Sequence, residues 1–202
     1  MADITRFGIK EVADVRFYDV PDLGETPETA AAIYEAIKGD TPVIEFDTLK
    51  VSNIESTAES SDARGGKGNA ALISWDYGRE VTVTIEDALM SMECLSLLFG
   101  DKTTDTITIN ANKFPGTYTV IGKTFARYEK DGKDRLFTFI IPKAKIQSET
   151  TLTMEAEGDP SVIGMTLKVL RCKNGDMMEL MMDADEYKET ADGLWAAEKS
   201  AT

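Results

Sequence analysis

Alternation between apolar and hydroxyl side chains is the pattern that most constrains what this chain folds into. It is strictest in Arg79–Ile85, REVTVTI, where three apolar residues are separated by threonines. Similar runs recur at short spacing, joined by turn signals such as Asp131–Asp134 and the hairpin signature Asn174-Gly175. About eight such strands around one apolar helix predict a mainly β fold, either a β-sandwich or a curled barrel.

Two segments predict helices instead. The first, Thr26–Lys38, has Thr26 as its N-cap and Pro27 at the first helical position, and Gly39 ends it. The second, Asp87–Phe99, is apolar on most of its sides and is therefore expected to be covered on most sides. It either plugs the mouth of the sheet or packs against another subunit. The residues that would make these contacts are Leu89, Met92, Leu95 and Phe99.

A polar stretch, Glu55–Asn69, lies between two strand-like runs. Its sequence, ESTAESSDARGGKGN, has three glycines and no large apolar side chain. Such a segment cannot bury enough apolar area to offset its ordering entropy, so we expect a structureless loop that is mobile in the free chain. A loose segment on a strand-rich domain indicates a subunit that becomes ordered when it meets copies of itself. The predicted inter-subunit contacts in this loop are Ser61, Asp62, Arg64, Gly65, Gly66, Lys67 and Gly68.

The predicted organisation has three parts. Residues 1–42 form an N-terminal arm and the short helix, and residues 43–183 form the β domain with the mobile loop 55–69. Residues 184–202 form an acidic tail that we expect to be mobile or dependent on assembly. A chain of 202 residues, 42% of them hydrophobic, is long enough for one β-rich domain with such appendages.

Composition argues against several classes of function. The formal net charge of −14 opposes binding to a phosphate backbone, which needs clustered Lys and Arg. The chain has no histidine, so the usual general base at neutral pH and the His-activated nucleophiles are missing. Cys94 and Cys172 are expected to be buried or idle thiols in a soluble protein made in a reducing compartment. The longest apolar run, Leu89–Phe99, is too short to span a bilayer.

The candidate chemical sites are weak. The glycine-rich Gly65–Asn69 lacks the Ser or Thr that follows the lysine of a P-loop. The acidic clusters Asp131/Asp134 and Asp183/Asp185/Glu186 lack the ligand pattern of an EF-hand. Trp75 and Tyr77 would suit a sugar-binding platform, although packing of these aromatics on the core is the favoured interpretation. The sequence therefore predicts no enzyme, no cofactor and no metal site.

Three segments carry a resemblance to a known family. They are LISWDYGREVTVTIEDALMS (72–91), FTFIIPKAKI (137–146) and MEAEGDPSVIGMTLKVL (154–170). Within the first segment the matching residues are Trp75, Asp76, Gly78, Glu86, Asp87 and Ala88. Over roughly half of its length the chain thus resembles the tail tube (major tail) proteins of tailed bacteriophages. These motifs are strands and turns, which are less specific than a catalytic signature.

The resemblance implies a structural virion protein. Such subunits are β-sandwiches or barrels that join edge to edge into hexameric rings, and the rings stack into a tube through which DNA passes without specific binding. It also implies self-assembly in the host cytoplasm, a final place in the virion tail, and tape-measure, sheath or terminator proteins as further partners, with no membrane partner. A long loop bridges neighbouring subunits in this family, and Glu55–Asn69 lies where that loop would be. Two alternatives stay open: another tail, neck or baseplate protein, and a β-sandwich module that binds a carbohydrate or receptor.

Overall fold

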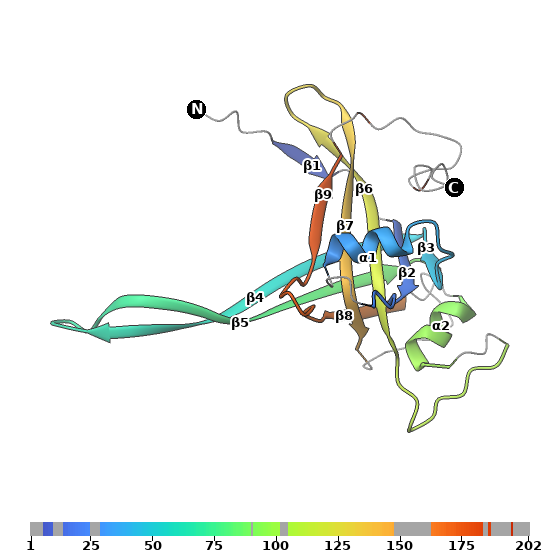
Figure 1. The fold of residues 1–202 in the computed structure, drawn as a ribbon, viewed down its shortest axis with the longest axis horizontal. Helices are drawn as coiled ribbons and strands as arrows, with labels where there is room; N and C mark the ends of the chain where they lie inside the picture. The colour runs from blue at the N-terminus through green and yellow to red at the C-terminus, as the bar shows by residue number, and fades with distance from the viewer. Residues whose placement is uncertain are drawn as a thin grey trace, which may run out of the picture.

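The strands and helices of this protein are seen in a computed structural model that describes residues 6–9, 14–24, 29–89, 91–101, 105–147, 163–183, 186 and 195. In this part of the chain nine strands form one sheet and two helices accompany it (Figure 1). The strands are β1 (Phe7–Ile9), β2 (Asp14–Asp19), β3 (Ile44–Phe46), β4 (Leu49–Gly65), β5 (Ala70–Asp87), β6 (Thr117–Tyr128), β7 (Asp134–Ile146), β8 (Ile163–Val169) and β9 (Glu179–Met182). The helices are α1 (Ala30–Ile37) and α2 (Met92–Phe99). The prediction of a mainly β fold with two helices is confirmed.

The sheet follows the order β3-β2-β6-β7-β8-β5-β4, and all of its neighbouring strands are antiparallel. Figure 1 shows β4, β5 and β8 running across the direction of β6 and β7, so the sheet folds over itself. In the described residues its two end strands, β3 and β4, do not pair with each other, and the sheet therefore does not close into a barrel. The second strand of this order, β2, comes from the part of the chain predicted to be an N-terminal arm.

The hairpin of β6 and β7 is long enough to serve two groups of strands. The first half of β6 pairs with β2, whereas its last residues pair with β1. β7 pairs with β9 near its start and with β8 at its end. The predicted turn between them is confirmed, since Gly132 has a φ of +68° and the Asp131 carboxylate accepts the Lys133 N–H.

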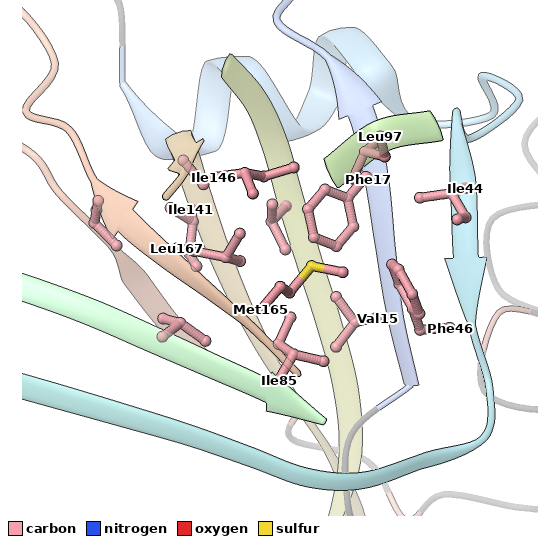
Figure 2. Packing of buried hydrophobic residues seen from close by; sticks show 14 of the residues in the cluster. Val15, Phe17, Ile44, Phe46, Ile85, Leu97, Ile141, Ile146, Met165 and Leu167 are labelled. Atoms are coloured by element: carbon pink, nitrogen blue, oxygen red, sulfur yellow. The ribbon is translucent and has the colours of Figure 1, made fainter. Parts of the chain in front are cut away.

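The main hydrophobic core lies on the inner face of the folded sheet (Figure 2). The predicted alternation in β5 is confirmed: its three apolar residues are buried and its two threonines are half-buried. Gly122 of β6 makes room for the Phe139 ring on β7, because a Cβ at residue 122 would lie 2.1 Å from Cζ of Phe139 and one of the two would have to shift. The buried members of this core are Val15, Phe17, Ile44, Phe46, Val81, Val83, Ile85, Cys94, Leu97, Leu98, Val120, Phe139, Ile141, Ala144, Ile146, Met165, Leu167 and Val169.

A second, smaller cluster lies on the outer face of β2 and β6. It brings together Tyr18, Ile37 of α1, Ile121 and Trp195. The Trp195 ring is buried, with the guanidinium carbon of Arg16 at 4.0 Å from its centroid and Lys123 Nζ at 4.4 Å. This residue of the predicted acidic tail thus packs on the body of a single chain.

α1 begins later than predicted. Thr29 is extended, with φ −108° and ψ 158°, and its hydroxyl accepts the Ala32 N–H at 3.1 Å. The predicted cap, Thr26, and Pro27 lie outside the described residues. The prediction of a helix that begins before Thr29 is nevertheless wrong, because Thr29 itself is extended. Both threonines have a suitable capping side chain, and only the cap at Thr29 directly precedes the buried stripe of the helix.

α2 also begins later than predicted, at Met92 instead of Asp87. Asp87 ends β5, and its carboxylate accepts the Thr48 hydroxyl and the Leu89 N–H. Ser91 is the N-cap, accepting the Cys94 N–H at 3.0 Å. The predicted stop at Gly100 is confirmed by its left-handed φ of +66°.

The hairpin predicted at Asn174-Gly175 is wrong. The turn itself forms, because Gly175 has a φ of +100° and its N–H donates to the Cys172 carbonyl. The strands on either side of the turn do not pair with each other: β8 pairs with β5 and β7, and β9 pairs with β7. One hydrogen bond, from the Cys172 N–H to the Asp176 carbonyl, flanks the turn, and beyond it pairing with the long β7 strand takes the place of the predicted hairpin.

Candidate assembly surface

An arm made of β4 and β5 extends from the body of the sheet (Figure 1). Its cross-strand pairs run from Thr57 opposite Glu80 at the base to Gly65 opposite Ala70 at the tip, and we call residues 57–80 the arm. Every β5 side chain from Ala70 to Glu80 is exposed. The arm is held mainly by pairing of its own two strands, with Lys168 of β8 reaching Glu80 at its base through an ion pair of 3.0 Å.

The structureless loop predicted for Glu55–Asn69 is wrong. Residues up to Gly65 belong to β4, and only Gly66–Asn69 form a turn. The prediction failed because it considered only apolar burial, whereas the partner strand Ala70–Arg79 satisfies the backbone N–H and C=O groups of the polar stretch. The mobility of this segment in the free chain stays a prediction.

Glycines shape the arm at two places. At the tip, Gly66 and Gly68 have φ of +77° and +91°, and Asn69 at +51° completes a turn that allows the chain to reverse. Near the base, Gly78 has a φ of +62° and sits where the strand register shifts between Thr57 and Glu59. A register shift of this kind is a β-bulge, which bends and twists a ribbon.

The two faces of the arm differ in chemistry. Residues directly opposite one another in an antiparallel pair share a face. One face therefore has the pairs Ala63–Ile73, Ser61–Trp75 and Glu59–Tyr77, and we call it the ribbon face. The other face has the polar pairs Asp62–Ser74 and Ser60–Asp76. The three large side chains of the ribbon face are more than half exposed. The expectation that Trp75 and Tyr77 pack on the core is therefore wrong.

The predicted contact residues of the arm lie on several of its surfaces. Ser61 belongs to the ribbon face, whereas Asp62 lies on the polar face and receives an ion pair of 2.7 Å from Arg64. Gly65 ends β4, and the other three predicted residues, Gly66, Lys67 and Gly68, form the tip. Their role as inter-subunit contacts stays a prediction.

Sequence reasoning did not single out Leu72 and the ribbon-face residue Ile73, two exposed apolar side chains of the arm. It placed the other two, Trp75 and Tyr77, in the core. A usable signal was present, because the order Ile73-Ser74-Trp75-Asp76-Tyr77 continues the period-two alternation of Arg79–Ile85 beyond Gly78. This signal was masked because exposed aromatics are uncommon on a single chain, and burial is the usual assumption for them.

One side of α2 packs on the core, and another side is exposed to solvent. Cys94, Leu97 and Leu98 are buried in the core. Burial, and then the charge of Asp87, raises the pKa of the Cys94 thiol to about 12. Of the four residues predicted for a plug or a subunit contact, Leu95 packs at the edge of the core and Phe99 is half-buried, while Leu89 and Met92 are 62% and 41% exposed.

The acidic side chains at the β6–β7 turn are paired with basic side chains of the same chain. Asp134 receives two hydrogen bonds from Arg127, at 2.7 and 2.6 Å, and Asp131 receives one from Arg135. Within the described ranges, no group of three or more acidic or cysteine side chains has the arrangement of a metal site. The described helices include none that is long and apolar enough to cross a membrane.

Comparisons with known proteins point to one family. Residues 27–104 and 100–180 match the model described as the YomU/Tube protein family. A chain in the cryo-EM structure of the anti-feeding prophage (AFP) baseplate, 6-fold symmetrised, aligns with a TM-score of 0.47 and 14% identity, over 86% of this chain and 95% of that chain. No curated protein matches.

Proposed function

The chain belongs to the YomU/Tube protein family, a family of structural, non-enzymatic phage tail tube proteins, and from this premise we propose that it polymerises into stacked rings that form the DNA channel of a tail. The observation that carries the proposal is the arm, which presents a paired ribbon with large apolar side chains outside the body of its own chain. Such a surface is typical of a protein that completes its burial with a second copy.

The free strand edges support the same role. In the described residues β3 and β4 have one unpaired edge each, and so do the short strands β1 and β9. Unpaired edges template pairing with another chain and are normally a hazard, but in a ring subunit they provide the contacts between neighbours. Because two different edges would meet, the contact is head-to-tail and can close into a ring.

The charge of the chain suits a channel for DNA. With a net charge of −14, a ring of copies would repel the phosphate backbone at close range instead of binding it. Tape-measure proteins and sheath or terminator proteins are the further partners that this role implies, in a tail assembled in the host cytoplasm. The alternative module that binds carbohydrate uses the same exposed Trp75 and Tyr77, but family membership favours assembly.

Electron microscopy of the purified protein tests the proposal, with an arm-deleted variant as the control. In that variant Asn-Gly replaces Ala58–Arg79 and joins Thr57 to Glu80, which face each other in the ladder. The wild type should form stacked rings with a central channel, and the variant should stay a folded monomer, because the β5 residues it loses are all exposed. A wild type that stays monomeric under all conditions, or a variant that forms normal tubes, would contradict the proposal.

A further inference from the structure

The strand at one end of the sheet, β3, is short and has few contacts. It has three residues and, among the described residues, pairs on one side only, with β2. Ile44 and Phe46 hold its inner side, because both point into the core (Figure 2). On the outer side the register places Glu45 opposite Arg16 of β2, and the Arg16 guanidinium donates to Glu45 Oε1 at 2.7 Å. A strand of this kind is expected to open locally more readily than strands inside the sheet.

The guanidinium of Arg16 also contacts a residue from the far end of the chain. Its central carbon lies 4.0 Å from the centroid of the Trp195 ring, and Trp195 is only 3% exposed. The Arg16 side chain is 17% exposed, against 39% for Glu45, so the ion pair is sheltered from water on its basic side. Reduced contact with water strengthens both the cation–π contact and the ion pair.

The orientation of this guanidinium depends on the Trp195 ring. Nε of Arg16 is buried and has no hydrogen-bond partner among the described residues. A guanidinium that lacks this hydrogen bond can rotate about its side-chain torsions unless a flat surface fixes its plane. The ring of Trp195 provides such a surface, and it thereby keeps the donating N–H group of Arg16 directed at Glu45.

We propose that Trp195 is a positioning residue for the edge strand β3 and acts on Glu45 through Arg16. This inference rests on the proposed function, in which the free edge of β3 pairs with a second copy. An edge strand that is already ordered loses less conformational entropy on pairing than one that must first become ordered. A residue of the predicted acidic tail therefore prepares an edge of the sheet for assembly.

Other contacts hold the Trp195 ring in place without belonging to β3. Lys123 Nζ of β6 lies 4.4 Å from the ring centroid, and Ile37 of α1 and Ile121 of β6 belong to the same buried cluster. These contacts fix the ring on β6 and α1, whereas Arg16 carries its effect to β3. The two roles can therefore be separated by substitutions that keep apolar burial at residue 195 and differ in whether they keep an aromatic face.

Trp195→Phe and Trp195→Leu make the matched comparison. Both variants leave an apolar side chain beside Ile37 and Ile121, and only phenylalanine keeps an aromatic face for Arg16. Hydrogen exchange followed by mass spectrometry is measured on dilute monomer, so this readout does not require assembly. Peptides that cover β3 report the edge strand, and peptides that cover β8 report the general stability of the sheet.

We expect the β3 amides of Trp195→Leu to exchange about tenfold faster than those of Trp195→Phe, while the β8 amides of the two variants differ by less than about twofold. Adding Glu45→Ala removes the group that Arg16 binds on β3, and it should abolish the difference between the two variants there. Equal β3 exchange in the two variants, or a β8 difference as large as the β3 difference, would overturn the inference. A β3 difference that survives Glu45→Ala would also overturn it.

Polymerisation of the same two variants separates this inference from the proposed function. At equal concentration, light scattering should show a longer lag before polymerisation for Trp195→Leu than for Trp195→Phe, and equal lags would overturn the link between Trp195 and assembly. If the wild type forms rings and the exchange difference at β3 is missing, the inference alone fails. If the exchange difference is found and the wild type forms no rings, the ordering of β3 by Trp195 is supported and the proposed function fails.

Discussion

Replacing Trp75 with alanine should separate folding from assembly. The Trp75 side chain is 54% exposed, so the single chain gains little from it, and the free energy of unfolding should change by no more than about 0.5 kcal/mol. If the exposed half of the indole is covered in the assembly, it removes on the order of 130 Å² from water, which at about 25 cal/mol per Å² amounts to about 3 kcal/mol for each arm contact. This is an upper value, because ordering the side chain at the contact costs part of it.

The measurement is the critical concentration for polymerisation. A loss of about 3 kcal/mol for each contact should raise that concentration roughly a hundredfold in sedimentation velocity experiments. Urea unfolding of the monomer gives the stability of the same variant, and Ser74→Ala on the polar face of the arm serves as the matched control. An unchanged critical concentration, or a Ser74→Ala variant that assembles equally poorly, would refute the assignment of the ribbon face as the contact.

Three further predictions concern the body of the chain. Gly122→Ala should lower the free energy of unfolding in urea by about 1–3 kcal/mol, because its Cβ would lie 2.1 Å from the Phe139 ring. Adding Phe139→Leu should restore part of the loss, and full stability of the single variant would show that the core can adjust at this position. Trp195→Ala should lower the free energy of unfolding by about 3 kcal/mol, because burial and the contact with Arg16 are lost, and Trp195→Phe should lower it less. Thermal unfolding measures both, and no change would show that the ring does not pack on the body in solution. The Cys94 thiol should resist Ellman's reagent at pH 8 in the folded chain, and rapid labelling of folded protein would contradict this. Its contribution to stability should be complete below pH 9.0 and decline toward pH 12, because the thiol of the unfolded chain ionises first.

Local patterns in the sequence were sufficient to predict much of the body. The alternation in β5 identified its buried face, and Gly100 identified the end of α2, because each depends on residues close together in the chain. The starts of both helices were misplaced for a physical reason. Thr26 and Thr29 are equivalent as capping groups, and Asp87 suits the first turn of a helix as well as the end of a strand, so tertiary contacts decide between them.

The sequence singled out the segment that forms the arm but did not predict its structure. The polar composition of Glu55–Asn69 correctly indicated that this segment buries no core residue, yet it did not reveal the pairing with Ala70–Arg79. Backbone hydrogen bonding between strands is insensitive to side-chain polarity, so composition has little power to distinguish an exposed ribbon from a loop. The packing of Trp195 against Arg16 and Lys123 joins residues far apart in the sequence, so no local pattern predicts it.

An exposed ribbon with aromatic side chains would normally invite indiscriminate pairing. Two features of the arm restrict this. The bulge at Gly78 twists the ribbon, so the edges of the arm are poorer templates for a flat neighbouring strand than the free edges of the body. On the polar face Asp76 adds a carboxylate, while Asp62 is paired with Arg64, and the net charge of −14 opposes the close approach of copies in general. The ribbon face differs, because Ile73, Trp75 and Tyr77 are exposed there and would gain free energy if a second copy covered them. The features that keep single chains apart therefore leave the ribbon face as the side of the arm from which assembly can gain apolar burial.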